Sequence, residues 1–258
     1  METLAAPAIP ARSGAALARP VPNATLVARE DLTPAVARFV VRPDEGPVPF
    51  RPGQYLALGL DVGERLLHRP YSTASPVGSR DLEFLVRLVV GGELTPRLWR
   101  LGVGDRLRVG RPKGVFTLID GDPRTHLFVA TGTGIAPFIS MLNALRSRPE
   151  PPRAIVLHGV AHVGELAYRK RLIDQAANSP LYVPVVSRPG TSGNEGWTGA
   201  TGHVDEVLGE LLRDRVVEAD AAVAYLCGNP GMLAAASRVL ADAGLAADTI
   251  RSEQYWVG

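Results

Sequence analysis

Residues 69–72 combine three side chains that can hold a nucleotide: Arg69-Pro70-Tyr71-Ser72. The guanidinium of Arg69 offers a planar fork that pairs with phosphate oxygens. The ring of Tyr71 offers a flat face for a flavin ring, and the hydroxyl of Ser72 can hydrogen-bond a ring nitrogen. This combination predicts a site for a flavin nucleotide.

A second anion site is expected where Gly91 and Gly92 precede Thr95. We expect Thr95 to be the N-cap, and Pro96 the first residue, of a short helix over residues 95–100. Backbone N–H groups at the start of a helix attract anions. Together with Arg69, this segment suits the diphosphate of a dinucleotide.

A glycine-rich turn, Thr131-Gly132-Thr133-Gly134, follows a continuous apolar run at residues 126–130. Glycines let the backbone approach a ligand closely, and the helix that begins at Ala136 offers N–H groups to an anion or a polarised amide. The pattern is G-x-G-x-x-P and departs from the dinucleotide fingerprint G-x-G-x-x-G. On these residues alone, a purely structural turn is an equal alternative.

Three further segments place reactive or aromatic residues after a strand or near the end of the sequence. Ser187-Arg188 follows a strand, where an arginine can bind a 2′-phosphate, although an ordinary surface arginine is the alternative. Cys227-Gly228-Asn229-Pro230-Gly231-Met232 is placed in the same way, but a lone cysteine is more often a core residue. Tyr255 and Trp256 are adjacent aromatics, and strand packing in the core is the alternative explanation for them.

Composition excludes several classes of function. The single cysteine among 258 residues excludes an internal disulfide and a four-thiolate iron–sulfur or zinc site. The five histidines lack metal-binding spacing, so no metal is expected, and there is no P-loop or G-x-S-x-G elbow. A net charge of +2 is too small to indicate nucleic-acid binding. No apolar run approaches the roughly 20 residues that span a bilayer, so we expect no stable membrane insertion.

The hydrophobic pattern changes near residue 120. Residues 22–120 contain short strands separated by proline and glycine, which predicts an antiparallel β-barrel. The expected strands are residues 24–28, 36–41, 54–58, 82–88 and 106–109. Residues 1–21 are rich in alanine and proline and are expected to form a flexible leader.

Residues 121–258 alternate between apolar strands and helices, which predicts a doubly wound α/β domain with a parallel sheet covered on both faces. The expected strands are residues 126–130, 154–158, 182–186 and 222–226, and Pro184 favours an edge position for the third. The expected helices are residues 136–146, 165–177, 204–212 and 232–243, the last closed by Gly244. Ligands should bind at the carboxyl ends of these strands.

The motifs described above, and their order along the chain, resemble those of the ferredoxin–NADP+ reductase family, in particular its bacterial ferredoxin/flavodoxin reductases. The resemblance covers residues 22–258 and implies FAD in the barrel domain, NADP(H) in the α/β domain, and an aromatic tail that returns to the flavin. The catalytic residues that it implies are Ser72, Cys227, Glu253 and Tyr255. The implied FAD-binding residues are Arg69, Pro70, Tyr71, Ser72, Arg87, Leu88, Val89, Glu93, Leu94, Thr95, Thr131, Tyr255 and Trp256. The implied NADP(H)-binding residues are Thr133, Gly134, Ser187, Arg188, His203, Cys227, Gly228, Asn229 and Met232.

The resemblance also implies individual roles. Tyr255 would cover one flavin face, Trp256 would pack on the adenine of FAD, and Cys227 would lie beside the nicotinamide. Glu253 matches the carboxylate of the E-x-Y ending of plant-type relatives. His203 stands where bacterial relatives often carry an arginine that holds the 2′-phosphate, so the preference for NADP(H) over NAD(H) is open.

The expected activity is hydride transfer from NADPH to flavin N5, followed by one-electron transfer to ferredoxin or flavodoxin. A monomeric cytoplasmic flavoenzyme is expected. Two alternatives are the reductase component of an oxygenase system, and a flavin-binding sensor or electron-transfer subunit without pyridine-nucleotide activity.

Overall fold

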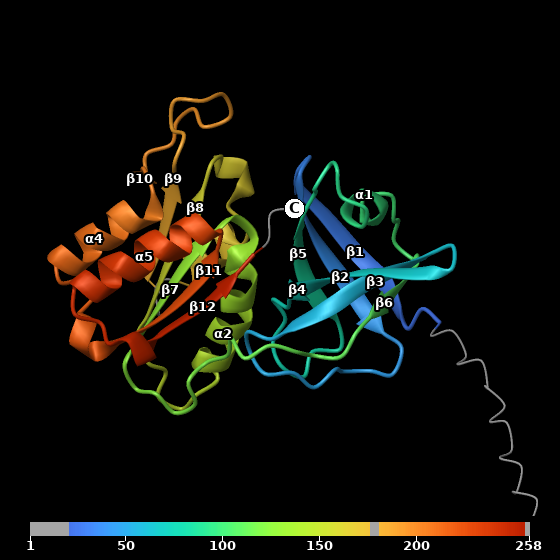
Figure 1. The fold of residues 1–258 in the computed structure, drawn as a ribbon, viewed down its shortest axis with the longest axis horizontal. Helices are drawn as coiled ribbons and strands as arrows, with labels where there is room; N and C mark the ends of the chain where they lie inside the picture. The colour runs from blue at the N-terminus through green and yellow to red at the C-terminus, as the bar shows by residue number, and fades with distance from the viewer. Residues whose placement is uncertain (1–20, 176–180, 256–258) are drawn as a thin grey trace, which may run out of the picture.

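Six antiparallel strands form the first half of the chain (Figure 1). The structure, a computed structural model, describes residues 21–175 and 181–255. The strands are β1 (Ala24–Thr33), β2 (Val36–Pro43), β3 (Tyr55–Val62), β4 (Arg65–Ser72), β5 (Leu82–Arg87) and β6 (Arg106–Val109). Their order is β4-β3-β6-β1-β2-β5, and a bridge between Thr73 and Phe84 joins the two ends. The predicted barrel is therefore confirmed, and Phe39, Leu56 and Leu107 belong to its core.

Strand β4 carries the motif at residues 69–72 and has no signal in the sequence pattern. Five of its eight residues are exposed, so it lacks the alternation of a half-buried strand. Pro70 cannot donate a ladder hydrogen bond, which β4 tolerates as the outermost strand in the order of the sheet. Its register with β3 pairs Ser72 with Tyr55 and Tyr71 with Leu56.

The short helix α1 (Thr95–Leu98) begins one residue earlier than expected. Its N-cap is Leu94, so the prediction that Thr95 caps the helix is wrong. The hydroxyl of Thr95 instead accepts the N–H of Val89 at 2.9 Å and donates to the Val89 carbonyl at 3.2 Å. This side chain closes the loop between β5 and α1.

An all-parallel sheet forms the second half, with the order β10-β9-β8-β7-β11-β12. Its strands are β7 (Thr125–Thr131), β8 (Ala154–Val160), β9 (Leu181–Val186), β10 (Ala200–Thr201), β11 (Ala222–Gly228) and β12 (Ile250–Gln254). The helices are α2 (Ala136–Arg146), α3 (Arg169–Asp174), α4 (Val204–Arg213) and α5 (Pro230–Asp242). The short 3-10 turns are η1 (Gly132–Ile135), η2 (Val163–Glu165), η4 (Ala219–Ala221) and η5 (Ala247–Thr249). One core lies between the sheet and α2 and α3, and a second lies under α4 and α5, so both faces are covered as predicted (Figure 1).

Two predictions for the second half need correction. The helix expected over residues 165–177 is interrupted, because Tyr168 adopts a left-handed conformation with φ of 61° and α3 begins only at Arg169. Strand β9 is not an edge strand, since β10 lies outside it. Pro184 nevertheless keeps an edge environment, because β10 pairs only with Val185 and Val186.

The two halves share a hydrophobic core. Val36 and Leu85 of the barrel pack in one cluster with Phe138 of α2. Phe116 and Leu118, from the segment that connects the two sheets, belong to the same cluster. The connecting segment is therefore part of the interface between the halves.

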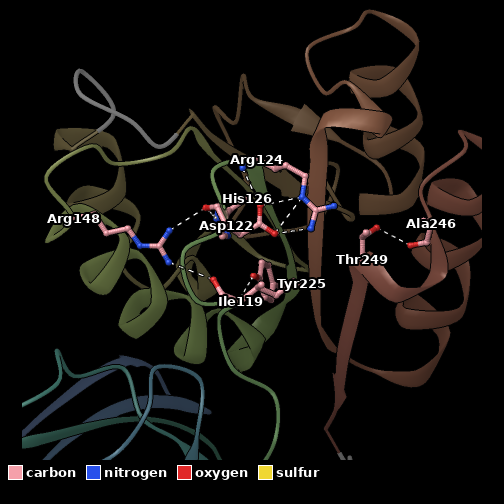
Figure 2. Close-up of polar contacts among 8 residues, drawn as sticks. All are labelled: Ile119, Asp122, Arg124, His126, Arg148, Tyr225, Ala246 and Thr249. Atoms are coloured by element: carbon pink, nitrogen blue, oxygen red, sulfur yellow. Dashed lines mark hydrogen bonds and ion pairs between the residues drawn. The ribbon is translucent and has the colours of Figure 1, made fainter.

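Hydrogen bonds to backbone groups hold the end of this connecting segment (Figure 2). Arg148 donates to the carbonyls of Asp122 at 3.1 Å and Ile119 at 3.4 Å. The hydroxyl of Tyr225 accepts the N–H of Ile119 at 3.0 Å. Burial lowers the pKa of His126, whose Nε2 lies 3.2 Å from the Asp122 carbonyl and must donate to it. These contacts fix the path of the chain between the two sheets.

Within the described ranges, every helix is too short or too polar to cross a membrane. In the same ranges, three or more His, Cys, Asp or Glu side chains nowhere gather in a way that could hold a metal ion. The leader expected at residues 1–21 lies outside the described residues except for Val21, and the expected domain limits at residues 22, 120 and 121 stay predictions.

Candidate active site

A cleft of about 1200 Å³ lies between the barrel and the parallel sheet. On the barrel side it is lined by the end of β4, by β5 and by the loop before α1. On the other side it is lined by residues at the carboxyl ends of β7, β8, β9 and β11. The cleft thus lies at the edge where ligands bind in doubly wound folds, and the binding of ligands there stays a prediction.

Strand β12 brings two side chains of the second half to the end of β4. It lies parallel to β11 with Glu253 beside Cys227, and the N–H of Tyr255 continues the pairing by donating to the Gly228 carbonyl at 2.9 Å. Glu253 and Tyr255 are two residues apart along extended backbone and therefore point to the same side. Tyr255 donates its hydroxyl to Ser72 Oγ at 3.2 Å, and Ser72 Oγ donates to Glu253 Oε2 at 3.2 Å.

This hydrogen-bonded chain has perturbed proton affinities. Burial raises the pKa of Glu253 to about 7, and the hydrogen bond from Ser72 only partly opposes that shift. Burial also raises the pKa of Tyr255 well above its usual value, so the phenol keeps its proton. Glu253 can therefore gain or lose a proton near neutral pH, while Ser72 and Tyr255 act as neutral hydrogen-bonding partners.

Cys227 lies next to the hydrogen-bonded side chains of Glu253, Ser72 and Tyr255, but it does not line the cleft. The side chain is fully buried, and both burial and the neighbouring Glu253 raise its pKa, so the sulfur is held as a neutral thiol. The structure thus gives Cys227 no direct access to the cleft, and its expected place beside the nicotinamide stays a prediction.

The glycine-rich turn is held from below by a buried histidine. His158 Nε2 lies 2.9 Å from the carbonyl of Gly132, and Nδ1 lies 3.3 Å from the hydroxyl of Tyr182. Because a carbonyl only accepts, Nε2 carries the proton, and Nδ1 accepts from Tyr182. Burial lowers the pKa of His158 to about 4, so the ring is neutral and fixes one orientation of the Gly132 carbonyl.

Two glycines allow the turn to pack directly on the segment after β11. A Cβ on Gly134 would lie 2.1 Å from the Cys227 carbonyl oxygen, and one on Gly228 would lie 2.1 Å from Thr131 Oγ1. Asn229 accepts the N–H of Met232 at 2.9 Å and so caps α5, while its own N–H reaches Thr131 Oγ1 at 3.3 Å. The two helix-initiating turns therefore form one unit.

An ion pair joins the two halves across the cleft. Arg87 Nη2 lies 2.9 Å from Glu165 Oε1, and the Glu165 side chain is only 12% exposed. The same arginine nitrogen would be 3.5 Å from a Cβ on Gly132. Arg87, expected to line the flavin with its backbone, thus also contacts the second half through its side chain.

The cleft is lined after β9 by Ser187 and Arg188, and at the start of α4 by His203 and Asp205. We call this part the far end of the cleft. Ser187 Oγ donates to the Val160 carbonyl at 3.2 Å, whereas the side chain of Arg188 is exposed. His203 is the N-cap of α4 and is also exposed. This end offers the guanidinium of Arg188 and the imidazole of His203 to an anion, together with the carboxylate of Asp205.

The barrel side fits a flavin dinucleotide. Arg69 lines the cleft and spends one of its five N–H groups on the His68 carbonyl, at 2.8 Å. Burial raises the pKa of Tyr71 to about 12, so its ring is a neutral aromatic surface in the wall of the cleft. The hydroxyl of Thr95 is occupied by Val89, so the second anion site that we expected can use only backbone groups.

Most predicted site residues line this one cleft. Those that do are Arg69, Pro70, Tyr71, Ser72, Arg87, Val89, Glu93, Leu94, Thr95, Thr131, Thr133, Ser187, Arg188, His203, Gly228, Asn229, Met232, Glu253 and Tyr255. Leu88, Gly134 and Cys227 do not line it, and Trp256 lies outside the described residues.

Several cleft residues escaped prediction. Tyr55 is paired with Ser72, so it could be found only after strand β4 had been recognised. Ala161, His162 and Glu165 follow the carboxyl end of β8, where the rule for doubly wound sheets could have indicated them. Asp205 lies in the first turn of α4 and has no motif to mark it.

Comparison with known proteins gives two family matches and close relatives. Residues 23–118 match the oxidoreductase FAD-binding domain, and residues 128–238 match the oxidoreductase NAD-binding domain. A ferredoxin–NADP reductase of Pseudomonas aeruginosa is 36% identical over 210 residues, covering 76% of this chain and 80% of that protein. The electron transfer component of anthranilate 1,2-dioxygenase from Acinetobacter baylyi is 32% identical over 80% of this chain, which covers 58% of that longer protein.

A solved structure shares the fold. The crystal structure of a ferredoxin NADP+ reductase from Neisseria gonorrhoeae, with bound FAD and NADP, superposes with a TM-score of 0.77 at 23% identity. The match covers 91% of this chain and 98% of that one. The arrangement of a barrel followed by a parallel sheet is therefore that of a known two-domain fold.

Proposed function

The chain belongs to the ferredoxin–NADP reductase family, and from that membership we propose that its physiological electron carrier is a ferredoxin. It is an oxidoreductase that uses FAD and NADP(H) and transfers electrons between the coenzyme and a one-electron carrier. The observation that supports this function best is the hydrogen-bonded chain Tyr255–Ser72–Glu253, which joins the two nucleotide-binding halves inside the cleft.

The barrel residues bind and orient the flavin. When bound, FAD supplies the exchange between a two-electron coenzyme and a one-electron carrier. Arg69 holds the diphosphate, Tyr71 provides a ring for stacking, and the loop fixed by Thr95 provides backbone groups. Trp256 is assigned to the adenine by the resemblance alone.

Residues of the hydrogen-bonded chain control orientation and protons. Ser72 presents a hydroxyl whose position is fixed by both Tyr255 and Glu253. Glu253 holds a proton below neutral pH and releases it above, because its pKa is raised to about 7. Tyr255 occupies the cleft wall between the halves and must move when the nicotinamide enters.

The α/β half binds the coenzyme. The turn that His158 orients offers backbone N–H groups to the coenzyme. Arg188 and His203, at the far end of the cleft, bind the 2′-phosphate. We further propose a monomeric, cytoplasmic enzyme, with flavodoxin as the alternative carrier.

A second candidate function is the reductase component of an oxygenase system, which the relative from Acinetobacter baylyi favours. This chain has one cysteine and so carries no four-thiolate cluster of its own. The two functions differ in which carrier is reduced fastest.

Stopped-flow spectroscopy of the flavin-loaded protein tests the proposal. NADPH should bleach the flavin absorbance, and ferredoxin should restore it faster than flavodoxin or an oxygenase-type carrier does. Ferricyanide reports the reductase activity independently of any protein carrier. Bleaching by NADPH with reoxidation by ferricyanide but not by ferredoxin would contradict the choice of carrier while leaving the oxidoreductase intact.

A further inference from the structure

The segment of residues 187–199 between β9 and β10 is tied down by one buried amide. Asn194 is 2% exposed although its neighbours on both sides are exposed. Its Oδ1 accepts the N–H of Val163 at 2.7 Å, and its Nδ2 donates to the carbonyl of Ala161 at 3.0 Å. Asn194 thus anchors the segment to the chain that follows β8.

The same amide also holds the backbone of Arg188. Asn194 Nδ2 donates to the Arg188 carbonyl at 2.7 Å. Thr191 adds its hydroxyl at 2.8 Å and its N–H at 3.1 Å to this carbonyl oxygen. Three donors therefore converge on one peptide group, directly at the residue whose side chain lines the far end of the cleft.

The surrounding sequence makes this anchoring necessary. The segment contains Gly190, Gly193, Gly196 and Gly199, and glycine loses more conformational freedom on ordering than any other residue. The adjacent Ser187 is fixed to β8 because its N–H donates to the Val160 carbonyl at 2.9 Å. Asn194 supplies the second fixed point, on the other side of Arg188.

We propose that Asn194 is a positioning residue for coenzyme selection, acting by holding Arg188 where it can bind a 2′-phosphate. The inference rests on the proposed function, and specifically on the role of Arg188. Replacement of a residue that acts only through Arg188 must weaken the binding of the 2′-phosphorylated coenzyme and leave the binding of the coenzyme without this phosphate unchanged.

The test measures binding and turnover in four single variants of the flavin-loaded enzyme and in one double variant. Asn194→Ala removes the whole amide, and Thr191→Val removes only the hydroxyl that reaches Arg188. Ser192→Ala, in the same exposed segment, is the matched control. Arg188→Ala measures the phosphate contact itself. Calorimetry with adenosine 2′,5′-bisphosphate and with 5′-AMP reports binding without turnover, and kcat/KM for NADPH and NADH reports selection.

The expected losses are graded. Arg188→Ala should weaken adenosine 2′,5′-bisphosphate binding about ten- to a hundred-fold, the range for a charge-assisted hydrogen bond. Asn194→Ala should weaken it about three- to ten-fold, and Thr191→Val by about two-fold, with 5′-AMP and NADH almost unchanged in both. In the Arg188→Ala background, Asn194→Ala should cause no further loss of NADPH preference, because the two residues act as a unit.

Each other result overturns a defined part of the inference. Suppose that Arg188→Ala lowers kcat/KM for NADPH but not for NADH, whereas Asn194→Ala and Thr191→Val lower kcat/KM for both coenzymes equally. The positioning role of Asn194 is then refuted, and Arg188 keeps its role. If Arg188→Ala lowers kcat/KM for NADPH and NADH equally, the proposed 2′-phosphate site is refuted, and the inference about Asn194 is refuted with it. Should Asn194→Ala not fold, Thr191→Val alone decides, since its side chain is exposed.

Discussion

Replacement of Glu253 by glutamine should make the stability of the protein less sensitive to pH between about pH 4.5 and 7. In the folded protein the pKa of this carboxyl is raised from 4.5 to about 7, chiefly by burial. Below pH 4.5 the group is protonated in both the folded and the unfolded chain, so it has no differential effect. Between about pH 4.5 and 7 the unfolded chain loses the proton first, and the folded state loses stability as the pH rises.

The magnitude follows from the size of the shift. One pKa unit corresponds to about 1.4 kcal/mol, so raising the pKa of Glu253 from 4.5 to about 7 lowers the unfolding free energy by at most about 3.5 kcal/mol above pH 7. Glutamine resembles the protonated acid and keeps an acceptor for Ser72, so the variant escapes this loss. For a protein of this size, a difference of about 3.5 kcal/mol raises the melting temperature by roughly 7–14 °C.

The assay is thermal unfolding of wild type and Glu253→Gln, each with saturating FAD, from pH 5 to pH 8.5. The difference in melting temperature should be small at pH 5 and should grow to a plateau above pH 7. Ser72→Ala provides a second check, because it removes the hydrogen bond that lowers the Glu253 pKa. In this variant the pH-dependent loss of stability should therefore extend to higher pH. A difference that stays constant across the whole range would refute a raised Glu253 pKa.

Three further predictions concern the cleft. Ser72→Ala should slow flavin reduction by NADPH in stopped flow while the FAD content stays at one per chain; an unchanged rate, or recovery of FMN in place of FAD, would count against the assigned site. Tyr255→Ser should bind NADP+ about two- to twelve-fold more tightly by titration, because a stacking competitor worth about 0.5–1.5 kcal/mol is removed; equal affinity would mean that Tyr255 does not gate the cleft. His158→Phe should raise the Kd for NADP+ several-fold without loss of FAD, because the carbonyl of Gly132 loses its buried donor at 2.9 Å; unchanged coenzyme affinity would show that the turn needs no such support.

The sequence predicts most of the fold because the core strands have a strong local signal. The continuous apolar runs of β7, β8 and β11 appear as fully or almost fully buried strands. Strand β4 escapes prediction because it is exposed and contains Pro70, so neither alternation nor β-propensity marks it. The break at Tyr168 also has no local signal, since a left-handed conformation is rare for any residue except glycine.

The site is predicted where a motif follows a strand and is missed where contacts depend on tertiary structure. Thr133 and Arg188 could be predicted because each follows an expected strand, whereas Ser72 is indicated by its motif alone; all three line the cleft. The partnership between Arg87 and Glu165 could not be predicted, because it joins side chains from opposite halves of the molecule. Asn194 is similar, since only the folded path of residues 187–199 reveals which carbonyls its amide meets.

The connecting segment limits how natural reductases of this kind can be recombined. Phe116 and Leu118 share a core with α2, and Ile119 and Asp122 give their backbone groups to Arg148, Tyr225 and His126. We call these contacts the clamp. A chimaera joined at residue 120 would keep the barrel side of the clamp but replace the helix and the strand that it contacts with foreign ones. A crossover before residue 114 transfers the clamp intact, so the junction that preserves folding lies upstream of the point where the sequence pattern changes.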